Sequence, residues 1–127
     1  MAERLNWSTK EIYLATDLLW TNGKSLLGRR DERVISLSNL LRAQHSGNID
    51  PSFRSPSSVA RKIQNIYDKL PEQKSLASKS NGSKLEDDVI KAFLLSESKA
   101  KSQVASILQN FQKVAEENIE EDFLELI

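Results

Sequence analysis

The segment Phe53–Tyr67 constrains the fold of this chain more than any other, because it joins a helix start to a helical repeat of apolar residues. Ser55 followed by Pro56 is typical of a capping residue and a first helical position, where the missing N–H of proline has no cost. Apolar residues then recur at three- or four-residue spacing: Val59, Ile63, Ile66 and Leu70. The segment therefore predicts an amphipathic helix from Pro56 to about Leu70, ended by Pro71.

Two helix signals precede this segment. Ser8 and Glu11 have the spacing of a capping box, in which each side chain binds the other residue's backbone N–H. The first helix should end at Asn22-Gly23, because glycine readily adopts the left-handed conformation at a helix C-terminus. Asp31 is a suitable cap for a second helix, whose inward residues are Val34, Leu37, Leu40 and Leu41.

Two further helices are expected after this segment. Ser83 and Glu86 repeat the capping-box spacing, and the pattern is interrupted at Ser96–Ser98 before a fifth helix. No segment alternates with the two-residue period of a strand. We therefore predict an all-α fold, with a three-helix, helix-turn-helix-like core in residues 1–71 and two C-terminal helices packing on it in residues 84–115.

Two segments are predicted to lie outside this packed body. Residues 72–83 are rich in serine and polar residues and are expected to form a flexible loop. Residues 116–127 place many carboxylates where the helix dipole is negative, which is unfavourable for a continuing helix. An acidic tail, frayed or separately docked, is the prediction for this end.

Composition excludes several classes of function. The chain of 127 residues has no cysteine and a single histidine, His45, so disulfides, zinc sites and histidine-dependent nuclease centres lack their residues. No motif combines a nucleophile, a base and a glycine-rich loop, so we expect no enzyme, no metal, no cofactor and no small-molecule substrate. No segment has the length of a membrane span, and no signal peptide is evident. A cytoplasmic protein is expected.

Net charge is zero, but the charges are unevenly distributed. Residues 1–75 hold 12 Lys and Arg against 8 Asp and Glu, whereas residues 76–127 hold 6 against 10. The first part therefore carries +4 and the second −4. This asymmetry suggests different partners for the two parts, and chance distribution is the alternative.

The polar side of the third helix is the main candidate for DNA contact. Helical spacing places Ser57, Arg61 and Gln64 opposite the apolar side, and Arg and Gln are suited to guanine and adenine edges. The other candidates flank them on this helix: Ser58, Lys62 and Asn65. The alternative is an ordinary solvated helix face.

Arginines around the second helix are candidates for phosphate contact: Arg29, Arg30, Arg33 and Arg42. Arg54 has two possible roles, contact with phosphate or hydrogen bonding to carbonyls that ties its turn together. Trp7 and Trp20 are expected to anchor the core.

The chain resembles two families. Trp7-Ser-Thr-Lys-Glu11 and Arg54-Ser-Pro-Ser-Ser-Val59 resemble the start and third helix of the Myb/SANT plan. A longer resemblance is to the helical N-terminal domain of bacterial and phage HNH endonucleases. It rests on the same tryptophan segment, on Leu37-Ser-Asn-Leu-Leu-Arg42, and on Phe53-Arg-Ser-Pro-Ser-Ser-Val-Ala-Arg-Lys-Ile-Gln-Asn-Ile66.

This resemblance implies a DNA-recognition module without the catalytic part, because no HNH module follows. Serine replaces both asparagines and the glycine of the family motif, which changes the groups available for contact. The alternative function is a protein-interaction module, a phage or host inhibitor or adaptor, that uses the helical surface and the acidic tail. Its candidate contacts are Phe123, Leu124 and Ile127. A homodimer is also possible, since a lone recognition helix gains specificity from a second module.

Overall fold

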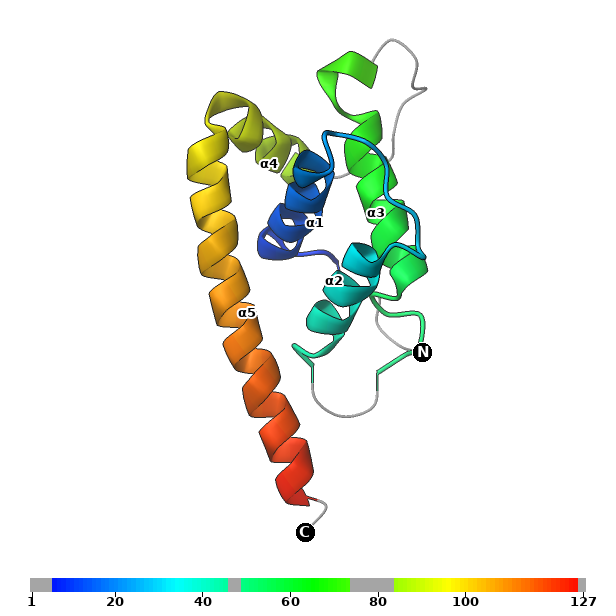
Figure 1. Cartoon of the computed structure of the whole chain (residues 1–127), viewed down its shortest axis with the longest axis vertical. Helices are drawn as coiled ribbons and strands as arrows, with labels where there is room; N and C mark the ends of the chain where they lie inside the picture. The colour runs from blue at the N-terminus through cyan, green and yellow to red at the C-terminus, as the bar shows by residue number, and fades with distance from the viewer. Residues whose placement is uncertain (1–5, 46–48, 74–83, 126–127) are drawn as a thin grey trace.

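A computed structural model of the chain describes residues 6–45, 49–73 and 84–125, with only the backbone of residue 73 and of residues 120–125 (Figure 1). The helices in these ranges are α1 (Thr9–Thr21), α2 (Glu32–Arg42), α3 (Pro56–Asp68), α4 (Lys84–Leu95) and α5 (Glu97–Glu125), with a short 3₁₀ turn, η1 (Pro71–Gln73). No strand occurs within them, so the prediction of an all-α fold is confirmed. Most of the loop predicted at 72–83, and its Ser83 cap, lies outside the described residues.

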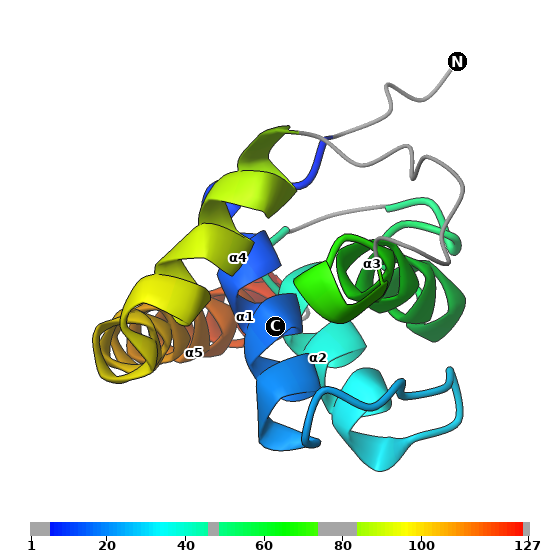
Figure 2. The same ribbon diagram turned by 90° about the horizontal axis from the view of Figure 1, so that it is seen from above.

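The helices form three layers. Figure 2 shows α3 on one side of α1 and α2, and α5 on the other. α3 packs against α1 and α2, while α5 packs against α1, α2 and α4. α3 and α5 therefore use α1 and α2 as a shared support and lie on opposite sides of them.

The helix starts follow the local signals in the sequence. Ser8 and Glu11 form the predicted capping box, with the Ser8 N–H donating to Glu11 Oε1 at 2.9 Å. Asp31 caps α2, and the Ser55 hydroxyl accepts from the Ser58 N–H at the start of α3. α1 ends at Asn22, followed by Gly23 with φ +66°, a conformation that favours glycine.

The core is continuous between the layers. Ile12 and Leu19 of α1 and Phe93 of α4 are among its fully buried side chains. Trp20 belongs to this core, with its ring 4.9 Å from Phe93, as predicted for an anchor. Trp7 is half-buried at its edge.

The C-terminal end of the chain corrects one prediction. The interruption near Ser96 is present, but α5 then runs without a break through the predicted tail to Glu125. Two side chains hold α5 against the end of α2: Gln44 Nε2 donates to the Phe111 carbonyl, and Asn118 Nδ2 donates to the Ala43 carbonyl, both at 2.8 Å. The dipole disfavours acids in the last turn only, so a helix that continues to Glu125 relieves Glu116 of this cost, while Asp122 and Glu125 in its last turn still bear it.

Candidate nucleic-acid interface

The outer face of α3 presents three of the predicted contact residues, Ser57, Arg61 and Gln64, all of which are exposed. We call these three residues the α3 face. The buried side of the helix consists of Val59, Ile63 and Ile66. Gln64 Nε2 donates to Asp68 at 3.0 Å, whereas Arg61 has no ion pair with any part of the chain that is described. Among the described residues, the Arg61 guanidinium at the centre of this face is therefore not neutralised by any carboxylate.

The connection between α1 and α2 brings further positive charge near α3. In both views it passes beside α3 (Figures 1 and 2). Leu27 anchors it in the core, and Arg29 and Arg30 are exposed. Arg33 differs from them, because its guanidinium makes two hydrogen bonds to Asp31 and its charge is compensated. Of the four arginines predicted around the second helix to contact phosphate, Arg29 and Arg30 are thus the two that are exposed and make no ion pair with the described residues.

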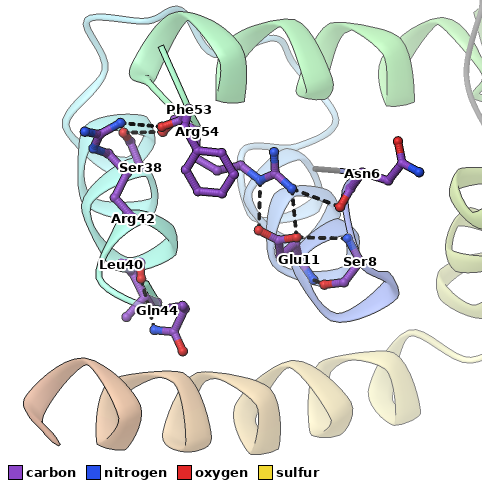
Figure 3. Close-up of polar contacts among 9 residues, drawn as sticks. All are labelled: Asn6, Ser8, Glu11, Ser38, Leu40, Arg42, Gln44, Phe53 and Arg54. Carbon is purple, nitrogen blue, oxygen red and sulfur yellow. Dashed lines mark hydrogen bonds and ion pairs between the residues drawn. The ribbon is translucent and has the colours of Figure 1, made fainter. Parts of the chain in front are cut away.

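Arg54 is not at the surface, which corrects its assignment to DNA contact. Arg54 is only 5% exposed. Its guanidinium forms a two-point ion pair with Glu11, in which Nε donates to Oε2 at 2.8 Å and Nη2 donates to Oε1 at 3.1 Å (Figure 3). Nη2 also donates to the carbonyl of Asn6 at 3.1 Å. The bond to the Asn6 carbonyl is of the kind predicted for its second role, but it joins the turn of Arg54 to the segment before α1, and the main acceptor is a carboxylate of α1.

Aromatic rings bracket this ion pair. The Arg54 guanidinium lies 4.5 Å from the centre of the Trp7 ring and 4.6 Å from that of Phe53. The backbone of Arg54 has φ +47°, an uncommon conformation for a residue with a side chain. The buried Ser38 hydroxyl donates to the Arg54 carbonyl at 2.7 Å and helps to hold it there.

Arg42 likewise serves the fold rather than the surface. Its Nη1 donates to carbonyls of the connection between α2 and α3, those of Asp50, Pro51 and Phe53. Together with Ser38, it links the Leu37–Arg42 segment to Phe53 and Arg54, as Figure 3 shows. The three sequence segments that carry the family resemblance therefore converge on one junction, and their most distinctive side chains stabilise it.

The ionisation of Glu11 reflects this junction. Burial by itself raises the pKa of Glu11, but hydrogen bonds from the Arg54 guanidinium and the Ser8 N–H outweigh it and hold the pKa below its ordinary value of 4.5. Glu11 thus serves the capping box and the ion pair at once. The sequence predicted the first role and missed the second.

Lys62 also departs from the predicted interface. Its Nζ lies 2.6 Å from Glu86 Oε1 of α4, and 5.5 Å from the centre of the Trp7 ring. Glu86 was expected in a capping box with Ser83, and its side chain is completely buried. The signal that could have placed it is its spacing from Val89, Ile90 and Phe93, which puts it on the apolar side of α4.

The remaining candidates are distributed as follows. Ser58 and Asn65 are half-buried at the edges of the α3 face. Phe123 and Leu124 belong to the last turn of α5, where the backbone alone is described, and Ile127 lies outside the described residues. Ile119, one turn before Phe123, is 66% exposed. Since α5 and α3 lie on opposite sides of α1 and α2, the acidic helix does not cover the α3 face.

Comparison with known proteins identifies no relative: no family model matches the chain, and no curated protein and no solved structure matches it significantly. Among the described residues, no three potential metal-ligating side chains come together. No helix in the described part of the chain is long and apolar enough to cross a membrane.

Proposed function

We propose that this chain is a non-catalytic module that binds duplex DNA through α3. The observation that carries the proposal is the α3 face itself. It points away from α1 and α2, and it presents an exposed Arg61 with no ion pair to the described residues. Within this proposal, α1, α2 and α3 are a helix-turn-helix-like core of a bacterial or phage protein, as the family resemblance implies.

The connection between α2 and α3 is a departure from the simplest form of that core. It spans residues 43–55, whereas a helix-turn-helix joins its helices by about three or four residues. The hydrogen bonds of Arg42 and Ser38 replace the short turn in fixing the two helices. The proposed likeness therefore concerns the packing of the three helices and the exposure of the third.

Each proposed contact residue has a chemical role. Arg61 offers two parallel donors to guanine O6 and N7, and Gln64 can exchange its bond to Asp68 for an adenine edge. Ser57 is placed for a phosphate or a base at the start of the helix. Arg29 and Arg30 supply phosphate contacts, which set position without reading sequence.

Because few cations remain available for phosphate contact, we expect DNA affinity to depend only weakly on salt concentration. Two phosphate contacts, by Arg29 and Arg30, release counterions and give a slope of log affinity against log salt of about −2. This shallow slope fits a chain whose net charge is zero. It also favours a module that acts beside a second DNA-binding element.

The test is fluorescence-anisotropy titration of short labelled duplexes at two salt concentrations. Arg61→Ala should lose about 1–3 kcal/mol on the preferred sequence and relax sequence preference. Arg30→Ala should weaken all sequences alike and lower the salt slope by about 1. Lys113→Ala is the control, because Lys113 is exposed on α5, on the far side of the molecule from α3. If the wild-type protein binds no duplex at low salt, or if all three variants bind as it does, the proposal is wrong.

One observation favours a protein-interaction module as the second candidate. At the corner between α4 and α5, Leu94 is 47% and Leu95 80% exposed, beside an open depression lined by Tyr13, Lys99 and Gln103. Large contiguous apolar patches mark interaction surfaces, and these two leucines contribute exposed apolar area at one corner of the molecule. A Leu94→Ser, Leu95→Ser double variant should keep its free energy of unfolding and lose partner capture in a pull-down, whereas retained capture would argue against this surface.

A further inference from the structure

Four charged residues meet where α3 and its following turn face the start of α4: Lys62, Lys69, Glu86 and Asp87. We call them the Glu86 cluster. Glu86 Oε1 lies 2.6 Å from Lys62 Nζ, while Oε2 lies 3.9 Å from Lys69 Nζ. Lys69 Nζ is closer to the exposed Asp87, at 3.1 Å. The strongest bond of the cluster is therefore the one between Lys62 and Glu86.

The carboxylate at the centre is incompletely satisfied. Glu86 is fully buried, and its Oε2 accepts no hydrogen bond among the residues that the structure describes. A buried carboxylate with an unsatisfied oxygen is costly, so this ion pair stabilises the fold less than a pair whose oxygens are all bonded. In some proteins such a residue serves a purpose other than stability.

The position of Lys62 suggests that purpose. Lys62 follows Arg61 directly and lies about 100° from it around α3. Its side chain is long enough to swing from α4 to the edge of the α3 face, where a DNA phosphate would lie. In the structure its ammonium instead faces Glu86 and the Trp7 ring. Glu86 and a DNA phosphate would therefore compete for the ammonium group of Lys62.

We propose that Glu86 is a positioning residue that withholds Lys62 from DNA, so that docking of the start of α4 and binding of DNA oppose each other. This inference rests on the proposed function. Because coupling between two binding events is reciprocal, DNA loosens the start of α4, and anything that loosens α4 strengthens DNA binding.

The test is a cycle of substitutions in the full chain, measured with a labelled mixed-sequence duplex at several salt concentrations. Glu86→Gln keeps the shape of the side chain and weakens its hold on Lys62. It should bind several-fold more tightly than the wild-type protein at low salt, with a salt slope steeper by about 1. Asp88→Asn is the matched control, because it removes the same charge from an exposed position of the same helix.

Lys62→Gln identifies the cation that is released. In the wild-type background it should leave DNA affinity unchanged, and in the Glu86→Gln background it should remove the gain. Equal affinities of Glu86→Gln and Asp88→Asn overturn the proposal, as does equal weakening by Lys62→Gln in both backgrounds. If one of these outcomes is found but Arg61→Ala binds the duplex more weakly than the wild-type protein, only the further inference is overturned and the proposed function stands. Absence of duplex binding by every protein rejects both.

A second measurement needs no substitution and covers poor folding of the variants. Amide hydrogen exchange in residues 86–90 of the wild-type protein should become faster when DNA is added, because phosphate competes with Glu86. The amides of α1, which is held by the Arg54 junction, should not become faster. Unchanged or slower exchange at the start of α4 with DNA bound contradicts the proposal.

Discussion

Two buried ion pairs flank Trp7, and they differ in how completely they are satisfied. In the Glu11–Arg54 pair, both carboxylate oxygens accept hydrogen bonds, and the guanidinium lies against the Trp7 and Phe53 rings. In the Lys62–Glu86 pair, one oxygen is bound at 2.6 Å and the other has no hydrogen bond within the described chain. The first joins α1 to the connection before α3, and the second joins α3 to α4.

The difference shows what a buried charge can contribute. A pair whose every oxygen is bonded fixes one geometry, since any rearrangement leaves a polar group unsatisfied in a low-dielectric interior. A pair with a spare oxygen loses less when it opens. Arginine suits the first role because its planar fork matches a carboxylate at two points, whereas lysine holds one point and can exchange partners.

Loss of Arg54 should have the largest effect on stability. Arg54→Ala leaves Glu11 buried without its counter-charge, which typically costs about 3–5 kcal/mol. Urea unfolding followed by circular dichroism measures this loss. Arg61→Ala is the matched control and should stay within about 0.5 kcal/mol, because Arg61 is exposed. A small loss for Arg54→Ala would contradict the statement that the Glu11–Arg54 pair fixes the geometry of its junction.

Loss of the charge at Glu86 should have a smaller effect. Glu86→Gln still accepts from Lys62 but weakens one charged hydrogen bond, so we expect a loss of about 1–3 kcal/mol in the free energy of unfolding. The same urea experiment with Asp88→Asn should show almost no change. If Glu86→Gln is more damaging than Arg54→Ala, the Glu86 cluster is the firmer of the two junctions and the comparison is reversed.

The smallest expected effect is the change with pH in the stability difference between the wild-type protein and a Glu11→Gln variant. The folded-state pKa of Glu11 lies below 4.5, so its ion pair contributes fully above that pH and is lost as pH falls through the lowered value. The stability gap between the two proteins, measured by urea unfolding from pH 7 downward, should narrow on acidification. Glu117→Gln, at an exposed position on α5, should show a small gap throughout. A gap that stays constant for Glu11→Gln would mean that its charge does not stabilise the junction.

Local patterns were the reliable part of the prediction. The caps at Ser8, Asp31 and Ser55, the end at Asn22 and the break near Ser96 are all where the sequence indicated. Each depends on residues within one or two turns, so short-range chemistry decides it. The outward direction of Ser57, Arg61 and Gln64 follows from the same helical period.

Charged side chains were the unreliable part. Lys62 was expected at the surface, as was Arg54 in one of its two predicted roles, and Glu86 was expected in a capping box, but each has a partner far away in the sequence. The prediction of an acidic tail was wrong for a similar reason. The hydrogen bonds of α5 to the end of α2, and its continuation to Glu125, cannot be inferred from the residues near position 116. A charge run read by itself gives the local dipole cost but not the tertiary contact that offsets it.

The sequence by itself determined where α1, α2 and α3 begin, their caps and the apolar face that each one buries, because these depend on spacing and on backbone groups close in the chain. Only the tertiary structure decided which cations remain available to a partner. Arg61 and Lys62 are neighbours in sequence, yet one is exposed and the other is held by Glu86. The physical reason is that a carboxylate buried on α4 is unfavourable without a neighbouring cation, and Lys62 of α3 provides that cation.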